Sequence, residues 1–424
     1  MNTDISPEQT IVLAKIRHIE ELERLDTCIQ FVESIGQIIH QVQAERGASC
    51  LYLASAGKRF APERADIISH NQATEADFRQ ALQQHLHLDL LTDARQLTLI
   101  SWILLGLDQL VALRHQVTLQ KISFTDCMES YSRLISSLIA LIFEISDSSV
   151  NSKISTCLLT LYNLVQTKEF AGQERAVGSY IYGSGSVQQA HQQRLLELID
   201  QQDRHIELFC QFGNQELRTA WDKLQATAPY RQHQQLRARL TTAKDHQPLK
   251  PSDADIWFDL CTQKQTSIWQ LQCVLIQKMH DMLEVLTHKA RHDLEYTQEY
   301  LQAISAKATP ASTLDGTFFN LSIPVESALS FQAHDSAQAY PMASMISLLQ
   351  QQSRQIADME SELSDTRKAL SERKQIERAK GLLMSKLGID EMEAYKTMRN
   401  LAMEQKRKII DVAENILTQQ KLPS

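Results

Sequence analysis

A stripe of residues near the N-terminus constrains the fold more than any other feature of the chain. Its members follow one another at alternating steps of four and three positions: Cys28, Val32, Ile35, Ile39, Val42, Arg46, Ser49 and Leu53. This spacing places all of them on one face of a single α-helix. Since most of them are apolar, the stripe predicts a long helix that packs in the core of a multi-helix protein.

Few residues in the chain interrupt helices. Only 12 glycines and 9 prolines occur in 424 residues, whereas average usage would give about twice as many of each. Gln, Leu, Ala, Glu and Lys are abundant instead, and all of them favour helices. The composition therefore predicts an all-α fold, and the length predicts two or three domains. Breaks between helices are expected near residues 56–62, 183–185, 228–229 and 247–251.

The stripe is repeated 129 residues further along the chain, counted from Arg46 to Arg175. The segments 44–56 and 173–185 share the order Glu-Arg-small, an aromatic residue and a small-Ser-small ending. The second stripe consists of Cys157, Leu161, Leu164, Lys168, Ala171, Arg175, Gly178 and Tyr182. This repeat predicts that residues 1–304 form a sensor of two similar helical bundles.

Arg46 and Arg175 occupy the same position on the two stripes. A guanidinium cannot lose its proton in a protein, so a buried arginine needs an anionic partner. The sequence leaves open an internal glutamate, solvent at the end of a bundle, or an external planar anion such as nitrate, which matches the guanidinium fork. Arg46, Arg175 and the small neighbour Ser49 are the candidate anion-binding residues. We expect alanine at either arginine to abolish an anion response without disrupting the fold.

The sequence contains no arrangement of residues that is typical of an enzyme or a metal site. It has no P-loop, dinucleotide-binding fingerprint, HExxH motif or catalytic triad. His85 and His87 are two positions apart and point in different directions on a helix, and the seven cysteines form no CxxC pair. We therefore expect a non-enzyme with reduced thiols that binds no metal and no cofactor.

Charge and hydropathy restrict the location and the partners. The net charge is -8, but basic residues are concentrated between Ser371 and Ile410. A small basic module on an acidic body is typical of a regulated nucleic-acid binder, although an ordinary mixed surface stays open. The N-terminus is polar, and Asp108 interrupts the most apolar stretch, Leu97 to Leu113. These features predict a cytoplasmic protein without a membrane span.

The pattern changes between residues 305 and 344. Pro310, Pro324 and Pro341 punctuate a stretch without helical periodicity, which we interpret as a linker. Residues 345–424 return to a helical pattern, and they begin with a heptad of Leu349, Ile356, Leu363 and Leu370. The heptad predicts a coiled-coil-like helix and permits a homodimer. Polar residues on its other seam weaken that prediction, and one helix packed on the sensor stays open.

A small three-helix module follows the heptad. Ile376, Ala379 and Leu383 form an apolar face, Gly388 ends the first helix, and a basic turn lies at residues 406–408. The module's candidate RNA-binding residues are Arg373, Lys380, Arg399, Lys406 and Arg407. Such basic side chains suit the phosphates of a structured RNA. From the residues alone, a helical dimerisation unit with solvated basic residues also stays open.

Two family resemblances sharpen this interpretation. The repeated Glu-Arg motif resembles the nitrate- and nitrite-sensing (NIT) family, over roughly residues 25–300. The C-terminal module resembles the ANTAR family of antitermination regulators. The matching residues are Leu370, Arg373, Ile376, Ala379, Lys380, Gly381, Leu383, Met384, Gly388, Ala394, Tyr395, Met398, Arg399, Ala402, Met403, Ile410, Val412, Ala413 and Ile416.

The resemblance implies a nitrate- or nitrite-responsive regulator of a nitrate assimilation operon. In the ANTAR family the module binds a leader mRNA element of paired hairpins with hexanucleotide loops and thereby prevents a terminator from forming. Two alternatives stay open. A ligand-responsive DNA-binding regulator would prefer duplex DNA to leader RNA, and a helical signalling scaffold would bind neither nucleic acid.

Overall fold

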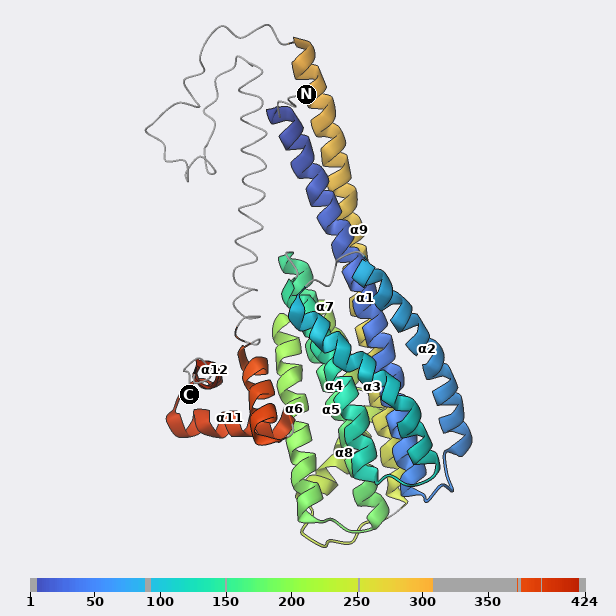
Figure 1. Cartoon of the computed structure of the whole chain (residues 1–424). Helices are drawn as coiled ribbons and strands as arrows, with labels where there is room; N and C mark the ends of the chain where they lie inside the picture. The colour runs from blue at the N-terminus through green and yellow to red at the C-terminus, as the bar shows by residue number, and fades with distance from the viewer. Residues whose placement is uncertain are drawn as a thin grey trace. The chain divides into compact units, whose positions relative to one another are not determined.

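The structure is a computed structural model that describes residues 6–87, 93–148, 151–250, 252–307, 372, 375–389 and 391–418. The regular elements in these residues are α-helices (Figure 1), which confirms the predicted all-α fold. The helices are α1 (Pro7–Ala54), α2 (Ala61–His87), α3 (Ala94–Thr118), α4 (Phe124–Ser148), α5 (Ser152–Ser184), α6 (Gln189–Phe212), α7 (Gln215–Gln225), α8 (Ala228–Thr242), α9 (Asp253–Lys307), α11 (Glu391–Gln405) and α12 (Ile409–Thr418).

Local sequence signals set several helix boundaries. Asp93 caps α3 by accepting a hydrogen bond from the backbone N–H of Arg95, and Thr227 caps α8 by accepting one from Tyr230. Such side chains satisfy backbone donors that have no partner inside the helix. After α1, the chain turns at Gly57, whose φ of 79° favours glycine. The breaks predicted near residues 56–62, 183–185, 228–229 and 247–251 are confirmed.

The long helices α1 and α9 run antiparallel to each other, side by side in Figure 1. Arg291 of α9 pairs with Glu23 of α1 at 2.7 Å, and His280 lies 2.9 Å from Asp26. These residues belong to one compact unit of the chain, which contains α1 up to Thr27 and α9 from Lys278. The remaining part of the sensor and the C-terminal module form the second unit.

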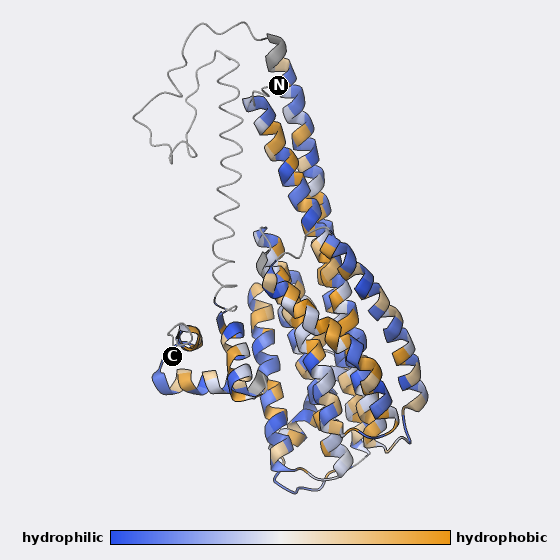
Figure 2. Cartoon of the chain, in the orientation of Figure 1, coloured by the Kyte–Doolittle hydropathy of each residue, from blue (hydrophilic) through white to orange (hydrophobic). Residues whose placement is uncertain are grey.

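Helix α5 is the most enclosed element of the sensor. Every residue from 158 to 175 on it is buried, although four of them are charged: Lys168, Glu169, Glu174 and Arg175. The other described helices carry both hydrophilic and hydrophobic residues (Figure 2), as expected for helices with one face in a core. Since a buried charge requires a partner, the charges on α5 indicate a candidate functional site in the core.

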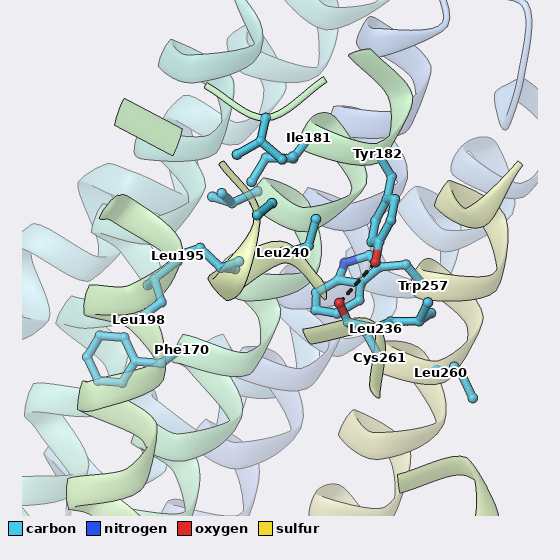
Figure 3. Close-up of a cluster of buried hydrophobic side chains, with 13 residues drawn as sticks. Phe170, Ile181, Tyr182, Leu195, Leu198, Leu236, Leu240, Trp257, Leu260 and Cys261 are labelled. Atoms are coloured by element: carbon cyan, nitrogen blue, oxygen red, sulfur yellow. Dashed lines mark hydrogen bonds between the residues drawn. The ribbon is translucent and has the colours of Figure 1, made fainter. Parts of the chain in front are cut away.

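A hydrophobic cluster fixes the C-terminal part of α5 against α6, α8 and α9 (Figure 3). In it, Tyr182 donates a hydrogen bond to the carbonyl of Leu236 at 2.9 Å. Trp257 donates its indole N–H to the carbonyl of Arg175 at 3.1 Å. The indole approaches α5 so closely that a Cβ on Gly178 would lie 2.3 Å from Trp257 Cε2. The contacts of Trp257 therefore fix the backbone of α5 at the turn that carries Arg175.

One helix of the described residues, α3, is long and apolar enough to cross a membrane by length and composition alone. Its polar residue Arg114, however, is buried and forms a two-pronged ion pair with Glu45 of α1. Trp102 and Val111 on the same helix are exposed, at 63% and 67%. The Arg114–Glu45 pair ties α3 to the helical bundle.

The C-terminal module contains a helix over residues 375–387, followed by α11 and α12. Ala379, Met398 and Ala413, one from each helix, form its core. Gly388 ends the first helix with a φ of 65°, and the chain turns again between α11 and α12. The predicted three-helix module is confirmed. Most of the predicted linker and the heptad over residues 345–370 lie outside the described residues.

Candidate functional site

The structure brings Arg46 and Arg175 to the same contact between α1 and α5. A Cβ on Gly47 would lie 2.4 Å from Nη2 of Arg175, and a Cβ on Gly172 would lie 2.7 Å from Nη2 of Arg46. Each guanidinium therefore packs against the backbone of the opposite helix, at a residue without a side chain. Both arginines are buried, so neither reaches solvent at a bundle end.

Arg46 has an internal carboxylate partner. Its Nη1 lies 2.5 Å from Oε1 of Glu169, and its Nη2 lies 3.0 Å from Oε2. Nη1 also donates to the hydroxyl of Ser132 at 2.7 Å. This two-pronged arrangement is the strong form of an arginine–carboxylate contact. Arg46 thus has an internal glutamate as its partner in this structure, one of the partners that the sequence left open.

Two amides complete the surroundings of the Glu169 carboxylate. Gln43 donates to Oε2 at 2.8 Å, and Gln173 donates to Oε1 at 2.8 Å. Together with the two nitrogens of Arg46, they give the carboxylate four hydrogen-bond donors. All four donors thus point at the planar carboxylate group of Glu169.

Arg175 differs from Arg46 in this respect. It donates to the hydroxyl of Thr262 at 3.0 Å, and its Cζ lies 4.8 Å from the centre of the Phe258 ring. Among the residues that the structure describes, no carboxylate lies within ion-pair distance of this guanidinium. Burial, assisted by the charge of Arg46, lowers the pKa of Arg175 to about 10. At neutral pH it is therefore a buried cation that has no carboxylate partner at ion-pair distance among the described residues, although the charge of Glu169 acts on it from further away.

A third cation, Lys168, lies on the same stripe of α5. Its side chain is 1% exposed, with Nζ 2.7 Å from Nδ1 of His40 and 4.8 Å from the centre of the Trp269 ring. The His40 ring stacks on Trp269 with 4.4 Å between centroids. Burial lowers the pKa of Lys168 to about 7 and that of His40 to about 3. His40 is thus neutral, and its Nδ1 accepts a hydrogen bond from the protonated Lys168.

The glutamates that precede the two arginines do not neutralise them. Glu45 binds Arg114 with both oxygens at 2.9 Å and accepts a hydrogen bond from Tyr131. Glu174 binds Arg237 with both oxygens at 2.6 Å and also lies near Lys264. The two halves of the sensor thus repeat the same design, a buried glutamate paired with an arginine from a later helix. Glu169 is left to balance Arg46, Arg175 and Lys168.

The hydroxyl of Ser49 is engaged elsewhere. It accepts a hydrogen bond from Nε of Arg64 at 3.1 Å and lies 3.4 Å from the hydroxyl of Tyr131. Ser49 therefore belongs to the surroundings of Glu45 rather than to those of Arg46 and Arg175. Glu169 and Lys168 were not among the predicted site residues. Lys168 lies on the same helical stripe as Arg175, and this spacing was the available signal for it. No sequence pattern singles out Glu169.

The basic residues of the C-terminal module differ in their exposure to solvent and in their ion pairs. Lys380 is 6% exposed and pairs with Glu377 at 2.7 Å, so it does not present its charge at the surface here. Arg399 is exposed and pairs with Asp200 of α6 at 2.9 Å. Lys406 and Arg407 are exposed in the turn between α11 and α12. Arg373 lies outside the described residues.

Helix α6 contacts α11 within one compact unit of the chain. Besides the Arg399–Asp200 pair, Lys396 pairs with Glu197 at 2.7 Å. The guanidinium of Arg204 lies 4.2 Å from the centre of the Tyr395 ring. Two basic side chains of the module are therefore neutralised by acidic residues of the sensor.

The fold and the two sites define a helical sensor protein that carries a separate effector module. The family model for nitrate and nitrite sensing matches residues 37–280, more than half of the chain. The chain therefore belongs to the nitrate- and nitrite-sensing family. The ANTAR domain model matches residues 364–417.

Two known proteins are similar over nearly the whole chain. The nitrate regulatory protein of Klebsiella oxytoca is 26% identical over 423 residues, which cover 97% of this chain and 96% of that protein. The solved structure of the NasR transcription antiterminator is similar in fold, with a TM-score of 0.58 and 23% identity, over 97% of this chain and 98% of that one.

Proposed function

We propose that this protein is a nitrate- or nitrite-responsive transcription antitermination regulator. Anion binding at Arg46 and Arg175 controls the binding of the C-terminal module to leader RNA. The observation that carries the proposal is the buried Arg175 cation, which has no carboxylate within ion-pair distance among the described residues. An uncompensated buried charge costs several kcal/mol, so it favours any anion that can reach it.

The chemistry of the site suits a small planar monoanion. The carboxylate of Glu169 pairs with Arg46, and its charge also acts on Arg175 and Lys168. Nitrate and nitrite present coplanar oxygens to a guanidinium fork and have a small volume to accommodate. The family membership and the nitrate regulatory protein of Klebsiella oxytoca support the same ligand class.

Helix α6 offers a direct connection between the anion site and the module. On its inner face, Gln202 donates to Glu174, the residue that precedes Arg175. On its outer face, Glu197 and Asp200 hold Lys396 and Arg399 of the module. We propose that anion binding weakens the outer contacts and frees Arg399 and Lys396 for RNA phosphates, together with Lys406 and Arg407.

The remaining features of the proposal follow from the family. The RNA partner is a leader mRNA with paired hairpins, and the module binds it without chemistry, so the protein acts as a regulator and not as an enzyme. Because antitermination takes place where mRNA is made, we place the protein in the cytoplasm. The heptad over residues 345–370 permits a homodimer.

Isothermal titration of nitrate into the full-length protein tests the anion site. The wild-type protein should bind nitrate, and the variants Arg175→Ala and Arg175→Lys should not, because lysine lacks the two-pronged fork. The surface variant Arg231→Ala provides a matched loss of charge, since Arg231 is exposed on α8. Equal binding by the Arg175 variants and the wild type would contradict the proposed site.

A further inference from the structure

We propose that Glu169 is a displaceable internal ligand of the anion site. Its carboxylate occupies the fork of Arg46, and an external planar anion binds by taking its place. This inference rests on the proposed function and specifies how the site is regulated. It assigns to Glu169 the role of a built-in competitor, which sets the affinity of the sensor and links ligand binding to a change at the α1–α5 contact.

The geometry of the carboxylate is the first support. Both oxygens of Glu169 face the two terminal nitrogens of Arg46, and the amides of Gln43 and Gln173 donate from either side. A carboxylate and a nitrate share a planar group with oxygens at similar spacing. Four donors arranged for the first therefore also suit the second.

Competition follows from the charges. The fork of Arg46 accommodates one two-pronged partner, so Glu169 and an external anion cannot hold it together. The neighbouring Arg175 and Lys168 lie close enough to respond to the charge of Glu169. A displaced carboxylate therefore stays among cations and does not become an isolated buried charge, which would prevent the exchange.

Displacement would also carry a signal. Glu169 belongs to α5 and Arg46 to α1, so their ion pair joins the two repeated halves of the sensor. Glu174, five residues further along α5, joins that helix to Gln202 of α6. Loss of the Glu169–Arg46 pair therefore removes one contact between α1 and the helix that is connected to α6 and, through it, to the module.

Nitrate titration of full-length Glu169→Gln tests the inference. Glutamine preserves the size of the side chain and an acceptor oxygen but removes the competing charge. We expect nitrate to bind about tenfold more tightly than to the wild type, a change of about 1.4 kcal/mol. Glu207→Gln removes the same charge from an exposed position of α6 and should leave the affinity unchanged.

A second variant covers the case in which Glu169→Gln does not fold. Glu169→Asp retains the charge but shortens the side chain by one methylene, so its carboxylate reaches the fork of Arg46 poorly. It should also bind nitrate more tightly than the wild type. Unchanged or weaker binding in whichever of the two variants folds, with normal binding in the wild type, would overturn the inference alone. Absence of nitrate binding in the wild type would instead overturn the proposed function.

Discussion

Arg175 places its guanidinium directly over Gly47, where a Cβ atom would lie 2.4 Å from Nη2 and 3.2 Å from Cζ. The contact explains why a glycine follows Arg46 on α1: the opposite arginine needs the space. Because the neighbouring atoms belong to the end of a flexible side chain, a methyl group at this position would move the guanidinium and not the backbone. A substitution at Gly47 can therefore move the Arg175 guanidinium without removing the arginine from the core.

Gly47→Ala should therefore weaken nitrate binding without unfolding the protein. Displacement of the Arg175 guanidinium misaligns its donors, and we expect the affinity to fall about tenfold. The control is Gly183→Ala on α5, where a Cβ meets nothing within 4 Å. Titration calorimetry measures the affinity, and thermal unfolding verifies the fold. The same affinity in both variants would show that the position of Arg175 is unimportant.

The two arginines should respond differently to alanine in unfolding experiments. Arg46→Ala leaves the buried carboxylate of Glu169 without its ion-pair partner, which costs about 3–5 kcal/mol of unfolding free energy. Arg175→Ala removes a cation that has no carboxylate partner at ion-pair distance among the described residues, so the unfolding free energy should fall by less than in Arg46→Ala, by the loss of the Thr262 and Phe258 contacts. Urea denaturation of both variants measures the difference. Equal losses would mean that Arg175 has a stabilising partner.

The sequence led us to expect that alanine at either arginine leaves the fold intact, and this stays a prediction. Because of the ion pair between Arg46 and Glu169, we expect the larger loss of stability in Arg46→Ala.

Nitrate affinity should decrease as the pH rises through about 7, the lowered pKa of Lys168. Below this pH, Lys168 is charged and adds to the positive excess of the site; above it, Lys168 is neutral and this attraction is lost. His40, with a pKa of about 3, stays neutral throughout. Titrations at pH 6 and pH 8 measure the change, and Lys168→Met should remove it. A pH dependence that survives in Lys168→Met would assign it to another group.

Neutralising the acidic residues of α6 should ease RNA binding. Glu197→Gln with Asp200→Asn removes the sensor partners of Lys396 and Arg399. Because exposed ion pairs contribute about 0–1 kcal/mol each, the loss of two pairs should tighten RNA binding by up to about thirtyfold in the absence of nitrate. The control is Glu207→Gln on the same helix. Gel-shift titration with a paired-hairpin RNA measures the effect, and no change in the double variant would argue against restraint by α6.

The sequence predicted the stripe and its two arginines because helical periodicity is a local property. It did not predict their partners. Consecutive residues point about 100° apart on a helix, so Glu45 and Glu174 face different neighbours from the arginines that follow them. Glu169 meets Arg46 only because α1 and α5 cross at Gly47 and Gly172, and such a crossing depends on the packing of the whole bundle.

In the C-terminal module, too, the sequence predicted the helical spacing but not the partners of the charged residues. Its core residues and the basic turn followed from helical spacing and from Gly388. The burial of Lys380 did not, because the side chain bends back to Glu377, three residues before it on the same helix. The pairing of Arg399 with Asp200 joins residues 199 positions apart. No local pattern reports a contact of that kind.

RNA binding by the full-length protein reports the coupling between the anion site and the C-terminal module. Labelled paired-hairpin leader RNA would be titrated with the wild type and with Arg175→Ala, in millimolar nitrate and in chloride of equal ionic strength, since salt alone alters RNA affinity. We expect tighter binding in nitrate for the wild type and no nitrate effect for Arg175→Ala. Wild-type binding that is equal in nitrate and chloride would contradict this coupling.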